Sequence, residues 1–214
     1  NLWKCTWKGC KPNFVKNEAN SIGEEKVEPV KDSSGKVVQF DKETFTYDYK
    51  GDNTLAEGKT QLLAFMEELN NLPTCNENSS ADDIQKVKDF YTNKMDGDLF
   101  LRTYAVNVIL GMWDDYWINN NNFYFYFDTN GKAYFIPYDY DNVLGVNGIG
   151  IDSAKHNPLE WGSLSDGNRP LIQKILQVPE YMEAYKKYLD EYSNEDSYFD
   201  DDASIARIKK WHDM

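Results

Sequence analysis

The stretch "DDYWINNNNFYFYFDTNGKAYFIPYDYDN", residues 114–142, decides the fold, because it combines a hairpin with polar clusters at both ends. Two alternating aromatic runs flank a Thr-Asn-Gly turn, and Asn130-Gly131 between such runs predicts a β-hairpin over residues 123–137. Pro137 ends the second strand because it has no N–H to donate to a ladder. A hairpin brings its two ends together, so we expect residues 119–122 and 139–141 to meet at its open end.

The rest of the chain predicts one α+β domain over residues 1–214 that is mainly helical. Residues 1–59 contain short β-like runs, two of them around a Ser-Ser-Gly turn, and we interpret them as a β-containing leading segment. Residues 60–214 are interpreted as mainly helical around the hairpin. Helical periodicity, capping residues and prolines predict helices within residues 60–73, 80–95, 96–117, 170–192 with a break at Pro179, and 201–214.

Residues 96–117 are apolar nearly all round, which is typical of a central buried helix. Its apolar side chains, from Leu99 to Leu110, are expected to form core. The Gly-, Asn- and Ser-rich stretch from Gly145 to Arg169 is longer than most passive connections, so we expect a loop that could be functional.

The charge balance excludes some classes of partner. Acidic side chains outnumber basic ones 36 to 23, which gives a formal net charge of −13. This excess argues against binding a nucleic acid through its phosphates. There is no run of roughly 18 or more apolar residues, so we expect no transmembrane segment.

The three cysteines bear on location. Cys5 and Cys10 could form a disulfide, and Cys75 would then be free or paired elsewhere. We interpret this set as favouring an extracytoplasmic protein with a disulfide over one with three thiols. The sequence begins with Asn1 and has no signal peptide, so we expect a processed form or a fragment.

The polar clusters around the hairpin suggest a cation or phosphate site. Carboxylate and amide oxygens are hard ligands suited to Mg²⁺, Mn²⁺ or Ca²⁺. Protein kinases place a catalytic aspartate and a metal-binding asparagine five positions apart, and a metal-binding aspartate after a short hairpin. Asp114, Asn119 and Asp139 follow this order, without the usual His-Arg and Phe-Gly neighbours. A purely structural turn remains an alternative, because Asn tolerates left-handed backbone geometry.

Residues 99–145 contain an ordered set of elements: Gly111–Asp114, Asn119–Phe123, Asn130-Gly131, Ile136–Asp141 and Gly145. This set resembles the core of the CotH family, the spore-coat-protein-H-type secreted kinases. The start "NLWKCTW" and the run "LLAFMEELNNLP" resemble segments of the family too, so the resemblance extends over residues 1 to about 180. Tyr138 stands where the family usually has Trp.

The resemblance implies a protein-kinase-like C-lobe that binds ATP with Mg²⁺ or Mn²⁺ and phosphorylates Ser or Thr on coat or other extracellular proteins. Carried over by motif, Asp114 is the catalytic aspartate, with Asp115 as the alternative. Asn119 and Asp139 bind the nucleotide–metal complex, and Asp141 is a further metal ligand. The family's N-lobe, with its phosphate-gripping lysine, is expected outside this chain, so activity of the isolated chain is left open.

Two alternatives to a kinase remain at this point. One is a noncatalytic surface or coat module of the same fold, in which the asparagines and aspartates form a structural turn and exposed tyrosines contact a partner or a carbohydrate. The other is a carbohydrate-active hydrolase with Asp114 and Asp139 as its paired carboxylates, whose separation the sequence does not reveal.

Overall fold

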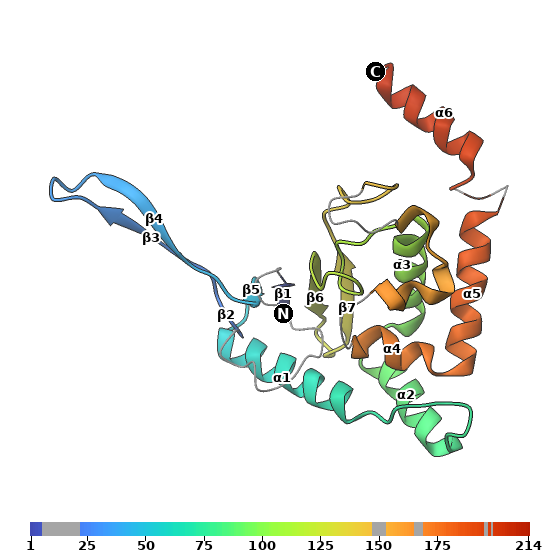
Figure 1. Cartoon of the computed structure of the whole chain (residues 1–214). Helices are drawn as coiled ribbons and strands as arrows, with labels where there is room; N and C mark the ends of the chain where they lie inside the picture. Colours follow the sequence, from blue (N-terminus) through green and yellow to red (C-terminus); the bar gives the residue numbers. More distant parts are fainter. Residues whose placement is uncertain (6–21, 147–152, 165–168, 195–196, 198) are drawn as a thin grey trace.

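A five-stranded sheet forms the centre of the computed structural model, which describes residues 1–5, 22–146, 153–164, 169–194, 197 and 199–214 (Figure 1). The predicted hairpin is confirmed as β6 (Phe123–Phe127) and β7 (Ala133–Pro137). β1 (Leu2–Cys5) pairs antiparallel with β6, and β5 (Tyr47–Tyr49) and β2 (Ile22–Gly23) extend the sheet beyond β1. The strand order is therefore β2-β5-β1-β6-β7, and the leading segment joins the hairpin in one sheet.

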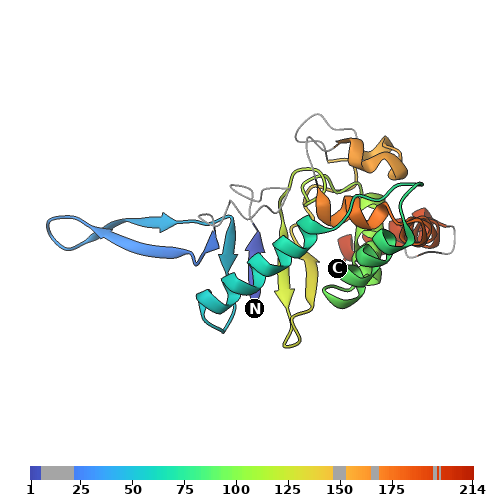
Figure 2. The same cartoon turned by 90° about the horizontal axis from the view of Figure 1, so that it is seen from below.

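The alternation of β6 decides which face of the sheet is buried. Phe123, Phe125 and Phe127 are buried, whereas Tyr126 on the opposite face is 42% exposed. α1 (Leu55–Asn71) crosses the sheet (Figure 2) and brings Phe65 within ring contact of Phe125 at 5.6 Å. β1, β6 and β7 are antiparallel, and antiparallel strands with one solvated face are the structure that such alternation predicts.

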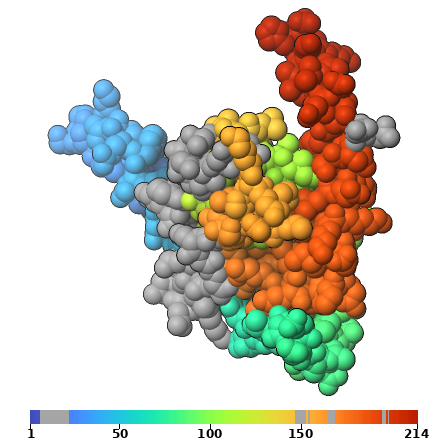
Figure 3. Space-filling view, turned by 45° about the vertical axis from the view of Figure 1, so that its right-hand side comes forward, coloured from blue at the N-terminus to red at the C-terminus, as the bar shows by residue number. Residues whose placement is uncertain are grey.

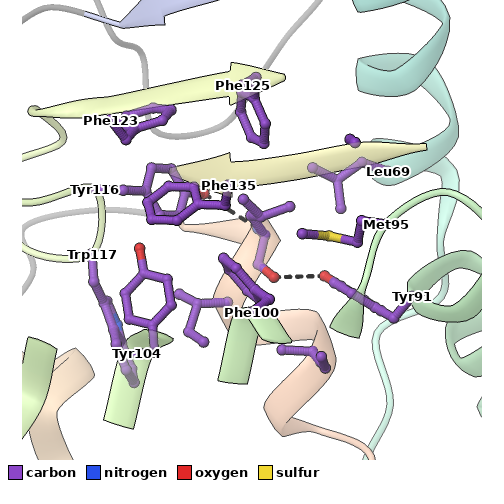
Figure 4. Close-up of a cluster of buried hydrophobic side chains, with 14 of the residues drawn as sticks. Leu69, Tyr91, Met95, Phe100, Tyr104, Tyr116, Trp117, Phe123, Phe125 and Phe135 are labelled. Carbon is purple, nitrogen blue, oxygen red and sulfur yellow. Dashed lines mark hydrogen bonds between the residues drawn. The ribbon is translucent and has the colours of Figure 1, made fainter. Parts of the chain in front are cut away.

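Aromatic rings fill the space between the hairpin and the helices (Figure 4). Phe135 of β7 stacks on Phe123 with ring centroids 5.1 Å apart, and Phe100 and Tyr104 of α3 (Gly97–Ile109) approach Phe135 at 5.4 and 5.5 Å. Tilted and edge-to-face pairs of this kind add to the stabilisation from buried area. The core therefore locks the hairpin against α3, whose C-terminal end leads directly to the polar stretch.

The first helices begin at side-chain caps. Thr54 and Glu57 form a capping box that starts α1 at Leu55, five residues before the helix predicted within residues 60–73. The sequence carried this signal, because Thr54 and Glu57 have the spacing that a capping box requires. Ser80 caps α2 (Ala81–Asn93), as predicted.

α3 ends earlier than the apolar run in the sequence predicts. Gly111 has a left-handed φ of 66°, and its N–H donates to the Val108 carbonyl at 3.0 Å. The Met112 N–H donates to the Asn107 carbonyl at 2.9 Å, which completes a Schellman motif. Most of the helix is buried as expected, but Leu99 is 48% exposed. Residues 112–117 consequently form the start of a loop, which frees Asp114 from helical geometry.

Further helical segments follow the hairpin. The predicted break at Pro179 is confirmed, because α4 (Pro170–Leu176) ends before it and α5 (Pro179–Ser193) begins with it. The predicted loop before α4 contains the short 3₁₀ helices η2 (Ser153–Lys155) and η3 (Pro158–Leu164), with Trp161 of η3 buried. The observed architecture is α+β, as predicted.

Two elements project from the body of the molecule (Figures 1 and 3). β3 (Lys26–Lys31) and β4 (Val37–Glu43) form a separate two-stranded ribbon, which we call the arm, and none of its residues is buried. α6 (Asp201–His212) is capped by Asp200 and likewise contains no buried residue. Both elements were predicted, but their exposure was not.

The structure tests part of the predictions about the cysteines and about a transmembrane segment. Cys75 is buried and free. The predicted Cys5–Cys10 pairing falls outside the described residues, because Cys10 is not among them. Within the described ranges, no helix has the length and apolar character that a membrane crossing requires.

Candidate active site

Asp114 lies in a cradle of asparagine amides just after the end of α3. Its Oδ1 accepts hydrogen bonds from Asn119 Nδ2 at 2.6 Å and Asn121 Nδ2 at 3.2 Å. Its Oδ2 accepts a bond from Asn122 Nδ2 at 3.0 Å, and the same amide group donates to the Asp114 carbonyl at 3.1 Å. These hydrogen bonds fix the orientation of the carboxylate. Asp114 is only half-buried, so its carboxylate can be reached from the solvent.

The asparagine run also allows the backbone to turn sharply. Asn120 and Asn122 have left-handed φ values of 61° and 56°, a conformation that Asn tolerates better than most non-glycine residues. Residues 119, 121 and 122 supply the amides to Asp114, while residues 120 and 122 make the sharp turns. The asparagine run is therefore both a turn and a carboxylate-binding loop. Non-glycine residues with positive φ cluster at functional sites, where the surrounding structure sustains them.

Asp115 is enclosed in the protein. Its Oδ1 accepts the Ile118 N–H at 3.1 Å, and its Oδ2 accepts a bond from Asn107 Nδ2 at 3.2 Å. Burial raises the pKa of Asp115 from an ordinary value of 3.8 to about 6, against the lowering effect of these hydrogen bonds. A carboxylate that is fully buried and already bonded through both oxygens cannot contact a molecule in the solvent. Of the two adjacent aspartates, only Asp114 is accessible.

The hairpin brings the two polar clusters to one end, as predicted. Phe123 pairs with Pro137, and the Tyr138 N–H donates to the Asn122 carbonyl at 3.0 Å. Asp139 follows with a left-handed φ of 63° and an exposed side chain. Asp141 is also exposed and accepts a bond from Asn142 Nδ2 at 2.8 Å.

The arrangement can be tested for its fit to a divalent cation. Asn119 directs Nδ2 to Asp114, so its Oδ1 points away from that carboxylate and stays available as a ligand. Asp139 and Asp141 add exposed carboxylates at the same end of the hairpin. In the part of the chain that the structure describes, no three His, Cys, Asp or Glu side chains form a metal-binding group by themselves. The two carboxylates and the Asn119 Oδ1 together provide the kind of oxygen donors that Mg²⁺ or Mn²⁺ prefers.

Arg169 holds the backbone of the loop between Asp115 and Asn119, and the sequence analysis did not identify it. Its side chain is buried, and it donates from Nε to the Tyr116 carbonyl at 3.0 Å and from Nη2 to the Ile118 carbonyl at 2.8 Å. These bonds fix the backbone between Asp115 and Asn119. An arginine at the end of a polar loop carries no sequence signal for this role.

Asn107 was also missed, although the sequence did carry a signal. It is a polar residue in the apolar run "YAVNVIL" of α3, and a buried amide there requires partners. Its Oδ1 accepts a hydrogen bond from the Tyr140 hydroxyl at 2.8 Å, and its Nδ2 donates to Asp115. Asn107 thus lies between the loop of Asp114 and the segment of Asp139.

Comparisons with known proteins agree with the family resemblance. A profile of the family described as "CotH kinase protein" matches residues 13–214. The chain is similar to "Spore coat protein homolog 1" of Rhizopus delemar, with 31% identity over 100 residues, or 44% of this chain and 16% of that protein. It is similar to "Invasin CotH7" of the same organism, with 27% identity over 116 residues, or 52% of this chain and 18% of that protein. The chain thus spans less than a fifth of these relatives. No solved structure matches it.

Proposed function

The chain belongs to the CotH kinase protein family, and on this premise we propose that it forms the protein-kinase-like C-lobe of an ATP- and metal-dependent enzyme that phosphorylates Ser or Thr. The observation that carries the proposal is the 2.6 Å hydrogen bond between Asp114 and Asn119, five positions apart, beside a hairpin whose second strand ends two residues before Asp139. Kinases use this order of an acceptor-binding aspartate, an asparagine and a metal-binding aspartate.

Each residue has a role that follows from its environment. Asp114 accepts a hydrogen bond from the acceptor hydroxyl and takes up its proton, because it is the accessible aspartate of the pair. The amides of Asn119, Asn121 and Asn122 hold its carboxylate in orientation. The Asn119 Oδ1, Asp139 and Asp141 would hold Mg²⁺ or Mn²⁺, which neutralises phosphate charge when bound.

The acceptor is proposed to be a coat or extracellular protein. The names of the two relatives refer to a spore coat and to an invasin, and both point to an extracellular or coat location. The net charge of −13 favours a protein acceptor over a nucleic acid. As the chain spans only a small part of the relatives, the proposal concerns the activity of the whole protein.

The test separates binding from transfer in the full-length protein. We expect calorimetric titration with ATP and Mn²⁺ to give saturable binding that Asp139→Ala abolishes. Asp114→Asn should keep this binding, because the residue does not hold the metal, and lower phosphate transfer by about 10²–10⁴-fold. Asp41→Asn, which removes an exposed carboxylate from the arm, is the control and should change neither property.

Two results would overturn the proposal. One is metal-independent nucleotide binding that Asp139→Ala leaves intact. The other is normal transfer by the Asp114→Asn variant, which would remove the catalytic assignment even if binding followed expectation.

A noncatalytic binding module is the second candidate, and the arm favours it. Val27, Val38 and Phe40 are 53%, 59% and 66% exposed on this projecting ribbon, which suits contact with a partner. The experiment is binding of the chain to isolated spore coats. Binding that Phe40→Lys abolishes and that Asp114→Asn with Asp139→Ala leaves unchanged would favour the module over the enzyme.

A further inference from the structure

The segment after the hairpin, residues 140–146, forms three hydrogen bonds with the C-terminal end of α3 and the loop that follows it. The Leu144 N–H donates to the Leu110 carbonyl at 2.7 Å, and Trp113 Nε1 donates to the Val146 carbonyl at 2.7 Å. The third bond comes from the Tyr140 hydroxyl, which donates to Asn107 Oδ1 at 2.8 Å. Only this third contact is made entirely by side chains, and only it lies between the two exposed aspartates.

Further hydrogen bonds connect the Tyr140–Asn107 contact to the loop of Asp114. Asn107 also donates a hydrogen bond from Nδ2 to Asp115 Oδ2 at 3.2 Å. Asp115 in turn accepts the Ile118 N–H on Oδ1 and the Asn121 N–H on its backbone carbonyl, at 3.1 and 3.0 Å. A continuous set of hydrogen bonds therefore joins Tyr140 to the loop of residues 114–122.

The direction of each bond in this set is determined by chemistry. An ionised carboxylate only accepts, so Asn107 must turn Nδ2 toward Asp115 and Oδ1 toward Tyr140. Tyr140 must then donate. Asn107 is fully buried, so loss of either partner leaves a buried amide group without its hydrogen bond.

We propose that Tyr140, acting through Asn107 and Asp115, is a positioning residue that sets the place of Asp139 and Asp141 relative to Asp114 and Asn119. Tyr140 is covalently next to both exposed aspartates, and Asp139 has a left-handed backbone that persists only under such constraint. This inference rests on the proposed function, in which these aspartates hold the divalent cation. The network gives the exposed ligands a rigid support, which metal sites require from the groups behind them.

The test removes one hydroxyl and measures metal affinity in the full-length protein. Tyr140→Phe should weaken Mn²⁺ binding, measured in the presence of a nonhydrolysable ATP analogue, by about 10-fold. The rate of transfer at saturating Mn²⁺ should change little, because Asp114 keeps its own amides. Tyr126→Phe, on the exposed face of the sheet, is the matched control and should leave the affinity unchanged.

A double-mutant cycle separates the network from a general loss of structure. Asn107→Leu should weaken Mn²⁺ binding as Tyr140→Phe does, and Tyr140→Phe should have no further effect in the Asn107→Leu background. Amide hydrogen exchange over residues 138–146 provides a readout that does not need activity. Exchange should be faster there in Tyr140→Phe and unchanged in Tyr126→Phe.

The outcomes distinguish this inference from the proposed function. Wild-type affinity and wild-type exchange in Tyr140→Phe overturn the network, and so do additive effects of the two variants on Mn²⁺ binding. If the wild-type protein binds no Mn²⁺ with nucleotide, the proposed function fails. The exchange rates of residues 138–146 then decide by themselves whether Tyr140 positions the segment.

Discussion

The arm and the β6–β7 hairpin are closed by the same turn, yet one is exposed and the other lies in the core. Both turns read Asp-x-x-Gly-Lys, at residues 32–36 and 128–132. The first N–H of each turn donates to the last carbonyl, at 2.9 and 3.0 Å. The aspartate Oδ1 accepts the N–H two residues later at 2.8 Å in both. Gly35 and Gly131 have φ values of 83° and 82°.

The difference lies in the strands. β6 alternates Phe with Tyr and buries its phenylalanines against the helices, whereas neither face of β3 and β4 is buried. The turn therefore specifies that a hairpin forms, and the apolar periodicity of the strands specifies where it packs. Only the packed hairpin can hold the polar loops with Asp114 and Asp139 in fixed positions at its open end.

The largest effect that follows from this contrast concerns matched phenylalanines. Phe125→Ala should lower the free energy of unfolding by about 3–5 kcal/mol, because the ring is fully buried and its loss leaves a cavity. Phe40→Ala on the arm should change it by less than about 0.5 kcal/mol, because that ring is 66% exposed. Chemical denaturation of both variants measures the two values. A loss of similar size at Phe40 would mean that the arm packs against something in solution.

A smaller effect follows from the buried carboxyl group of Asp115, close to the open end of the packed hairpin. The pKa of Asp115 is about 6 in the folded protein, above the ordinary value of 3.8. Between these pH values the folded state holds a proton that the unfolded state has released, so Asp115 lowers stability progressively as pH rises from about 4 to 6. The full contribution is about 3 kcal/mol.

Asp115→Asn isolates this contribution, because the variant cannot titrate there. The free energy of unfolding of the variant minus that of the wild type should rise by about 2–3 kcal/mol between pH 4 and pH 7, and level off above the folded pKa. Denaturation at several pH values gives this difference, in which the other titrating groups cancel. A difference that stays constant over the range would contradict the burial of an ionised Asp115.

The hairpin and its convergence of polar residues could be predicted from the sequence because their signals are local. Asn130-Gly131 between alternating aromatic runs determines the turn, and the period of two determines the buried face. The meeting of residues 119–122 with residues 139–141 follows from the topology of any hairpin. The break at Pro179 and the cap at Ser80 have equally local causes.

The rest depended on tertiary contacts. The carbonyls that Arg169 contacts are about fifty positions away in the chain, so no spacing rule connects them. The choice between Asp114 and Asp115 depends on which side chain faces the core after the Schellman motif at Gly111, and adjacent residues of the same type cannot reveal that. The exposure of the arm differs from these cases, because its sequence did carry a signal. β3 and β4 mix charged with apolar residues and lack the regular alternation of β6.

The smallest predicted effect uses the two turn glycines and tests the comparison most closely. Gly131→Ala and Gly35→Ala place the same side chain on the same left-handed backbone, with open space or ordinary contact around the new Cβ, so the local strain is about 1 kcal/mol in both. At Gly131 this strain should lower the global free energy of unfolding, because the hairpin unfolds with the core. At Gly35 the arm can open by itself, so the global value should stay unchanged while amide exchange over residues 26–43 becomes faster. Denaturation and amide exchange on both variants supply the two readouts. An equal global loss at both positions would show that the arm folds cooperatively with the body, and the turn would then matter more to stability than the packing of the strands it joins.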